Sequence, residues 1–191
     1  MPDYTAPFAI VVGVAEVWIA PVGESFPAID AVPAGNWISL GSTNDDGVSV
    51  THQREVEIHF KGNSVLPQKG SLAEAQERIS MAFVELTVER YAKLLDDASV
   101  STVAAGSGTA GYKLFNLAPD LNQYALLVRG PSPVMNAYAQ YEYARVSPMG
   151  DRELQYQKVD KTELPVEFVA FEDTNNPGRF GQYRAQTATA L

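Results

Sequence analysis

Two histidines, several acidic pairs and one glycine-rich segment are the parts of this 191-residue sequence whose chemistry could support catalysis or binding. His52 and His59 are the only histidines. Seven positions apart on one extended strand, their side chains would point to opposite faces and could not bind one metal ion together. The chain has no cysteine, which removes thiolate nucleophiles, thiolate metal sites and disulfides. The sequence therefore predicts no metal site.

A catalytic site is not indicated either. Neither GxSxG nor another nucleophile elbow accompanies the two histidines. The adjacent acidic pairs Asp45-Asp46 and Asp96-Asp97 fall at the predicted ends of elements, where solvated turn or helix-end roles are the default. Because so little of the usual inventory of an active site is present, we expect no catalytic residue and no enzyme activity.

The glycine-rich segment Gly106–Gly111, GSGTAG, matches the GxGxxG pattern that binds dinucleotide phosphates. That motif requires a preceding buried strand, a following helix and an acidic residue about 20 positions further on. Here a predicted helix precedes the segment, a short strand follows it, and Tyr124–Pro133 contains no acid. We therefore interpret the segment as a mobile loop and expect no cofactor.

The charge of the chain argues against nucleic-acid binding. Its formal net charge is −9, and the first 50 residues contain no lysine or arginine. The second half is rich in aromatic residues, which could stack on bases, but a basic groove is lacking because only Lys113, Arg129 and Arg145 are basic in Tyr112–Val146. Packing within a sheet or at a subunit contact explains these aromatic residues better. The charge by itself is equally compatible with a role in solubility alone.

Most of the elements that would position these residues are predicted to be strands. Val48–Phe60 alternates apolar and polar side chains with a period of two, interrupted on the apolar side by His52 and Arg54. This alternation is typical of an antiparallel sheet with one covered face. Arg78–Leu86 is apolar on both sides and predicts a central strand. The further predicted strands are Val14–Ala20, Trp37–Gly41, Tyr112–Leu117, Tyr124–Arg129, Ala137–Val146, Gln155–Lys161 and Leu164–Phe171.

The remaining segments predict one helix and several connections. Thr87 is a plausible N-cap for a helix over Val88–Asp97, whose apolar side chains recur at helical spacing. Residues 61–76 lose the alternation and contain two glycines and a proline, which predicts a long exposed loop. Asn44–Gly47, residues 98–111 and Asp173–Arg179 are predicted turns or flexible connections, and a short tail begins at about residue 174. We expect a single β-rich domain over residues 1–191.

The order of these elements resembles the major tail tube proteins of long-tailed bacteriophages. The matching segments are AEVWIAPVG at 15–23, NWISLG at 36–41, DGVSVTHQREVEIHF at 46–60, RISMAFVELTVERYAKLLDD at 78–97 and LPVEFVAFED at 164–173. The resemblance covers nearly the whole chain, from about Val14 to Phe171, and rests on the order and spacing of the segments. It implies a β-sandwich or half-barrel of antiparallel strands with one flanking helix.

The resemblance also implies a function. Tail tube proteins assemble into hexameric rings that stack into a hollow tube, through which DNA passes without specific binding. The implied partners are further copies of this chain, the tape-measure protein and other tail proteins. The implied location is the virion tail, after synthesis in the host bacterial cytoplasm. The implied contact between subunits or rings is the loop at about 61–76, with these candidate residues: Lys61, Gly62, Asn63, Val65, Leu66, Pro67, Gln68 and Lys69.

Further expectations concern the charge of the channel and the absence of membrane insertion and export. An excess of carboxylates suits a channel that must not bind phosphates, so the lumen is expected to be net negative. Phe8–Ala20 is too short for a membrane span and has no basic residue before it, so we expect neither insertion nor export. The alternative functions are a related ring-forming tail component, the tube protein of a bacterial injection system, and a β-sandwich that binds carbohydrates or host surfaces.

Overall fold

The computed structural model describes residues 15–62, 65–85, 87–95, 100–117, 121–131, 137–150, 153 and 163–187. These residues form a mainly antiparallel β structure with one helix, which confirms the expected fold class of a β-sandwich with a single flanking helix. The elements are β1 (Glu16–Pro21), β2 (Ile38–Gly41), β3 (Thr43–Phe60), β4 (Pro67–Phe83), α1 (Val88–Leu94), β5 (Ser101–Val103), β6 (Tyr112–Leu114), β7 (Tyr124–Pro131), β8 (Tyr138–Met149), β9 (Leu164–Ala170) and β10 (Gly181–Ala185).

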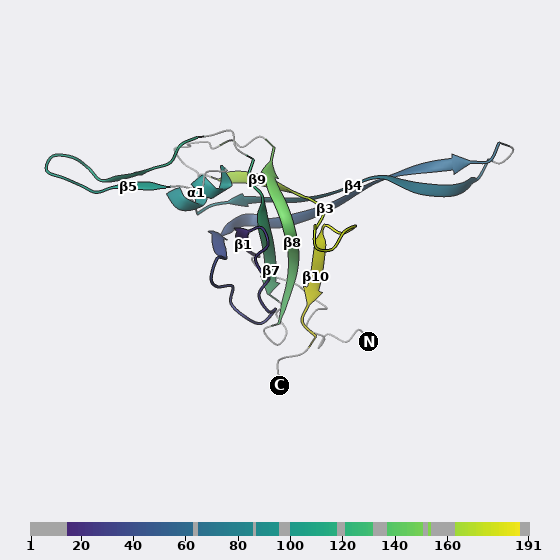
Figure 1. The fold of residues 1–191 in the computed structure, drawn as a ribbon, viewed down its shortest axis with the longest axis horizontal. Helices are drawn as coiled ribbons and strands as arrows, with labels where there is room; N and C mark the ends of the chain where they lie inside the picture. The colour runs from purple at the N-terminus through teal and green to yellow at the C-terminus, as the bar shows by residue number, and fades with distance from the viewer. Residues whose placement is uncertain are drawn as a thin grey trace.

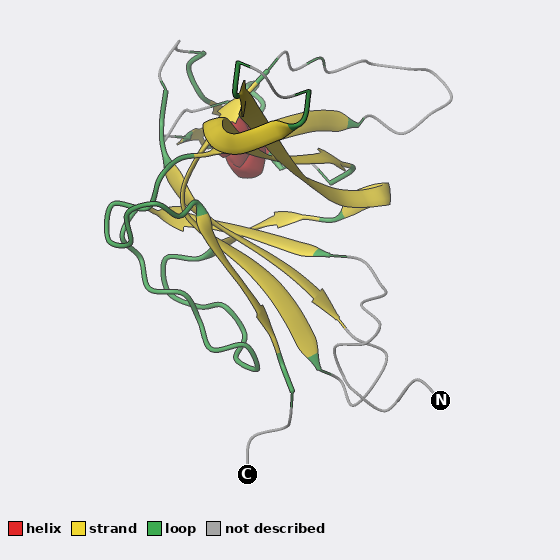
Figure 2. Cartoon of the chain, turned by 90° about the vertical axis from the view of Figure 1, so that its right-hand side faces the viewer, coloured by secondary structure: helices red, strands yellow, loops and turns green. Residues whose placement is uncertain are grey.

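The main sheet folds over on itself into two layers. Its strand order is β2-β1-β7-β8-β9-β4-β3, and β10 pairs with β8 beside this path. Strand β8 belongs to both layers: residues 138–146 pair with β7, whereas residues 146–149 pair with β9. Figure 2 shows the strands splayed into two layers. One continuous sheet therefore supplies both walls of the sandwich, as expected when a strand bends from one layer into the other.

The main core lies between the two layers. Leu126 and Tyr143, opposite each other on β7 and β8, point into it from one layer. Phe83, opposite Leu164, and Ile79, opposite Phe168, point into it from the other layer. All six side chains are buried. Because alternate residues of a strand face opposite sides, this register explains which apolar residues of the predicted strands fill the core.

The first layer is covered on its second face by the segment between β1 and β2. Trp37 packs there against Phe26 and donates a hydrogen bond from Nε1 to the Ser25 carbonyl oxygen at 3.0 Å. Trp37 also packs with Ala125 and Leu127 of β7 in a small second apolar cluster. The turn-rich excursion predicted between the first two strands is therefore a structural cover for the sheet.

The helix begins where the sequence predicts. The Thr87 side chain accepts a hydrogen bond from the Arg90 backbone N–H at 3.3 Å, and Glu89 lies in the first turn, where the helix dipole favours a negative charge. Described helical structure ends at Leu94, and Asp96 and Asp97 lie outside the described residues. Among the described residues, none of the helical structure is both long and apolar enough to span a membrane.

The predicted turn at Asn44–Gly47 is wrong, because these residues lie inside β3 as a bulge. Thr43 pairs with Phe83 and Val48 pairs with Met81, so four residues of β3 stand opposite one residue of β4. Gly47 has a φ of 71°, a left-handed conformation that accommodates the extra residues. The residue types that indicate a turn here produce an irregularity within a strand.

The predicted loop over residues 61–76 is also wrong in its extent. Residues 67–76 belong to β4 and pair with β3, so that β3 and β4 form one long hairpin that projects from the body (Figure 1). Both faces of this part of β4 are exposed, so no buried face imposes an apolar–polar alternation on its sequence. Its Gly and Pro residues are tolerated because neither face has to pack against a core.

Two smaller predictions are corrected in the same way. Residues 100–114, expected to begin in a flexible segment, form a second hairpin from β5 and β6. The turn at Asp173–Arg179 is confirmed, since the Asp173 backbone N–H donates to the Arg179 carbonyl oxygen at 2.8 Å. The short tail expected after it instead forms β10, which pairs with β8. The predicted strand Gln155–Lys161 lies outside the described residues.

Candidate assembly surface

The projecting part of the β3–β4 hairpin, residues 52–60 with 67–77, has one largely apolar face and one polar face. We call it the long arm. Val56 pairs with Leu72, Ile58 with Gly70 and Phe60 with Pro67, and directly paired residues share a face. The larger apolar side chains on this face are between half and two-thirds exposed; they are Val56, Ile58, Phe60 and Leu72. Ile58 and Gly70 border a shallow hollow of about 310 Å³, in which Gly70 contributes no side chain.

The base of the long arm is marked by a polar cluster. His52 pairs with Glu77 across the strands, and its Nδ1 lies 2.8 Å from Glu77 Oε1. Tyr143 Oη donates a hydrogen bond to the same Glu77 oxygen at 2.8 Å. Burial first, and then this bond to Glu77, raise the pKa of the Tyr143 hydroxyl. On the body side of the cluster, Val48 and Val50 pack against the main core. The interruption at His52 in the apolar pattern therefore marks where β3 leaves the core.

The opposite face of the long arm is polar. Glu55 stands directly opposite Glu74, and like charges at such positions destabilise a sheet. His59 Nε2 lies 2.9 Å from Ser71 Oγ, and both residues are exposed. This histidine–serine contact lies on an open strand surface and lacks the enclosed pocket and aligned acid that a nucleophilic serine requires. Among the described residues, no group of three or more His, Cys, Asp or Glu side chains is arranged to hold a metal ion.

The outer edge of the long arm is available for pairing. Strand β3 is the last strand of the described sheet on that side, so its backbone groups along that edge face away from the sheet. The strand is 18 residues long. A long edge strand is a template for pairing with another chain unless something covers it.

The candidate contact residues from the sequence lie at the tip of the long arm. Lys61, Gly62, Val65 and Leu66 are exposed in the connection between the strands, and Asn63 lies outside the described residues. Pro67, Gln68 and Lys69 are the first residues of β4 and are exposed as well. The structure thus places the described candidate residues together at the far end of the hairpin, where residues 67–69 are strand and not loop. Val56, Ile58 and Leu72 were not among the candidates, although the alternation of Val48–Phe60 indicated the first two.

The glycine-rich segment forms the tip of the β5–β6 hairpin. Gly106 and Thr109 exchange backbone hydrogen bonds of 3.0 and 3.1 Å around Ser107 and Gly108. Gly108 has a φ of 75°, which such a tight turn favours. No helix begins there, so the segment lacks the geometry of a dinucleotide site. The signal that could have revealed this hairpin is a two-residue Ser-Gly turn between short segments of strand-forming residues.

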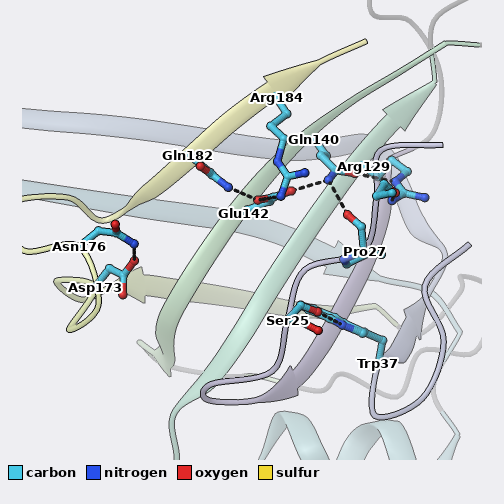
Figure 3. A network of polar contacts seen from close by, with 11 residues as sticks. Ser25, Pro27, Trp37, Arg129, Gln140, Glu142, Asp173, Asn176, Gln182 and Arg184 are labelled. Atoms are coloured by element: carbon cyan, nitrogen blue, oxygen red, sulfur yellow. Dashed lines mark hydrogen bonds and ion pairs between the residues drawn. The ribbon is translucent and has the colours of Figure 1, made fainter. Parts of the chain in front are cut away.

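A buried polar network holds the cover segment of the first layer in place (Figure 3). Arg129 donates to the carbonyl oxygens of Ala28 and Ala31, at 3.1 and 2.6 Å, and to Gln140 Oε1 at 3.0 Å. Burial lowers the pKa of the Arg129 guanidinium, although nearby acidic groups oppose the shift. Gln140 Nε2 donates to the Pro27 carbonyl oxygen at 3.4 Å. These bonds satisfy buried polar groups and fix residues 27–31 over the sheet.

The adjacent carboxylate completes the network. Glu142, which is 1% exposed, accepts hydrogen bonds from Gln140, Gln182 and Arg184. It borders a hollow of about 500 Å³, which Arg145 and Asp173 also line. The Asn176 side chain first, and then the Asn175 N–H, lower the pKa of Asp173 by hydrogen bonding. These carboxylates already have donors within the chain, so we interpret them as structural.

The chain matches no model of a known protein family, and no curated protein is significantly similar to it in sequence.

Proposed function

We propose that this chain is a structural subunit that assembles with copies of itself into stacked rings, which form the hollow tail tube of a long-tailed bacteriophage. The observation that carries the proposal is the long arm, whose apolar face is exposed and whose outer strand edge has no partner strand among the described residues. A sheet edge and an apolar face together offer backbone hydrogen bonds and hydrophobic burial to a second chain. The activity would be the polymer itself, with no catalytic step.

The charge of the arm supports self-association. Residues 52–77, the long arm with its connection, contain three basic side chains, Arg54, Lys61 and Lys69, and four acidic ones, Glu55, Glu57, Glu74 and Glu77, whereas the whole chain has a net charge of −9. This part of the chain therefore carries a net charge of only −1, and bringing two copies together there adds little charge repulsion. Most of the acidic excess lies elsewhere and would keep a channel from binding DNA phosphates. A tube whose bore is lined by lysine and arginine would contradict this part of the proposal.

Electron microscopy of negatively stained protein at high concentration tests the proposal. We expect hollow rods with a regular axial repeat. In a matched truncation, residues 56–73 are removed and Glu55 is joined to Glu74 through Asn-Gly, a two-residue turn that fits paired antiparallel strands. This variant should fold, as judged by circular dichroism, and should form no rods.

Two substitution variants test separately how each face of the arm contributes to rod formation. Replacing Val56, Ile58 and Phe60 by threonine keeps strand propensity and removes the apolar face, so it should abolish rods. Replacing Gln53 and Glu57 by threonine alters the polar face and should leave rods intact. Normal rods from the truncated chain would show that the arm has another role. Isolated particles of the unmodified chain at every concentration and salt would contradict the proposal as a whole.

One observation favours a second candidate function, the binding of a carbohydrate. A hollow of about 410 Å³ is lined by Tyr141 and Tyr183 together with Asp45 and Asp46. The two tyrosine rings lie 4.7 Å apart, and Tyr183 is half exposed. Aromatic faces with nearby carboxylates can bind sugar rings. Binding on a glycan array that is lost in Tyr183→Ala, from a chain that remains monomeric, would favour this alternative over the tube.

A further inference from the structure

The β5–β6 hairpin has an exposed apolar face of its own. We call residues 100–114 the short arm. Val103 pairs with Tyr112 and Ser101 with Leu114, so these four side chains share one face. Tyr112 is 54% exposed, and Val103 and Leu114 are each 37% exposed. The face carries no charge.

The other face of the short arm is tied to the body. Thr102 and Lys113 share that face, and Lys113 Nζ contacts Glu89 Oε1 on α1. This contact lowers the pKa of the Glu89 carboxyl. Immediately after β6, the Phe115 ring meets Tyr91 of the helix edge-on, with ring centroids 5.6 Å apart. The helix therefore holds one side of the arm, and the apolar side faces away from it.

The two arms extend from opposite ends of the subunit. Figure 1 shows β5 at one end of the longest axis and the far ends of β3 and β4 at the other. Their apolar faces therefore cannot meet within one chain. A two-stranded ribbon with strands of three residues is too small to be stable by itself and gains stability from a cover.

We propose that the apolar face of the short arm packs on the apolar face of the long arm of a neighbouring copy of this chain. The interaction is heterologous: one copy contributes Val103, Tyr112 and Leu114, and the next contributes Val56, Ile58 and Leu72. Repeating such a contact from copy to copy generates a ring if the rotation closes and a filament if it does not. This inference rests on the proposed self-assembly and specifies which surfaces meet in it.

The charges and shapes of the two arms fit each other. The long arm with its connection has a net charge of only −1, and Lys113, the one charged residue of the short arm, is paired with Glu89 on the same chain. Residues 104–111, AAGSGTAG, contain no side chain larger than threonine. The short arm is therefore a narrow ribbon that can lie along another sheet without placing an unpaired charge in the contact.

Engineered cysteines test the contact directly, because the natural chain has none. A double variant with Ile58→Cys and Tyr112→Cys carries one thiol on each arm. After oxidation, or treatment with a flexible thiol-reactive cross-linker, it should give a ladder of covalent multimers on a denaturing gel. Each single variant should remain monomeric on this gel, because a covalent dimer would reveal a symmetric contact between like arms.

The outcomes of this test separate the contact from the proposed function. A ladder in the double variant alone supports the contact between unlike arms. Tubes without a ladder would overturn the contact and leave the proposed function standing. Particles with neither tubes nor a ladder would overturn both.

A charge placed on the short arm provides an independent test. Tyr112→Asp should remove the sedimentable polymer while leaving the circular dichroism spectrum and thermal midpoint of the monomer unchanged. Val32→Asp is the matched control, since Val32 is 79% exposed on the cover segment. This control should polymerise like the unmodified chain. Normal polymerisation of Tyr112→Asp would overturn the proposal.

Discussion

The two halves of the β3–β4 hairpin have similar sequences and opposite environments. Near the body, Val48 and Val50 pack against the main core and are paired with Met81 and Ile79. Beyond His52, Val56, Ile58 and Phe60 continue the same alternation, but they are more than half exposed. An apolar–polar alternation with a period of two therefore indicates a strand but does not indicate what covers its apolar face. That face can be covered within the chain or by another chain.

Two phenylalanines of this hairpin should differ most in how much they contribute to the free energy of unfolding. Phe83 is fully buried at the body end, whereas Phe60 is 61% exposed at the far end. Phe83→Ala should lower the free energy of unfolding by about 3–5 kcal/mol, since it leaves a cavity in the core. Phe60→Ala should change it by less than about 0.5 kcal/mol in the monomer. Urea denaturation of dilute protein measures both, and equal effects would contradict the division of the hairpin.

The buried polar network should produce the next largest effect. Arg129→Met keeps the length of the apolar stem but leaves the carbonyl oxygens of Ala28 and Ala31 without their donor. We expect a loss of about 2 kcal/mol in the free energy of unfolding, because the hydrogen bonds from a charged group to the cover segment are lost. Hydrogen exchange should rise in residues 24–36 and stay unchanged in the long arm. Faster exchange throughout the chain would show that the network stabilises more than the cover segment.

The polar cluster at the base of the long arm should make stability depend on alkaline pH. The pKa of Tyr143 is raised in the folded chain, whereas an unfolded tyrosine titrates near pH 10, as ordinary tyrosine does. Above about pH 10 the unfolded state therefore releases a proton that the folded state retains, and the free energy of unfolding falls as the pH rises. Urea denaturation between pH 7 and pH 11 should show this fall.

The Tyr143→Phe variant tests whether Tyr143 causes this fall in stability. The fall in stability above about pH 10 should become smaller in this variant, although burial also raises the pKa of Tyr141, which should leave part of the dependence in place. At pH 7 the variant should lose about 1 kcal/mol, since Glu77 loses one hydrogen bond. An unchanged alkaline slope would show that Tyr143 does not control it.

A substitution on the polar face of the long arm should change the stability of the monomer least. Glu74→Lys converts the opposed pair of Glu55 and Glu74 into an opposite-charge pair and should stabilise the monomer by about 0.2–1 kcal/mol. Glu74→Gln, which removes the repulsion without adding an opposite charge, is the control and should have a smaller effect. Thermal melts at low salt measure the difference. A gain that persists undiminished at high salt would contradict its electrostatic origin.

The local elements of this protein follow from its amino-acid sequence. The alternation of Val48–Phe60 predicted its strand, Thr87 predicted the start of the helix, and Asp173–Arg179 predicted a turn that the structure confirms. These features depend on residues close together in the chain, whose backbone preferences and hydrogen bonds are readable from their order. The candidate residues at the tip of the long arm are a similar case, since their exposure follows from local composition.

The pairing and the environment of these elements depend on tertiary contacts. Residues 67–76 become a strand because β3 offers them backbone hydrogen bonds, although their own composition favours a loop. Glu142 is buried, despite its charge, because donors from β8 and β10 converge on it. The two arms lie at opposite ends because of how the sheet folds over (Figure 1). Such outcomes depend on contacts between residues far apart in the chain, which no local pattern encodes.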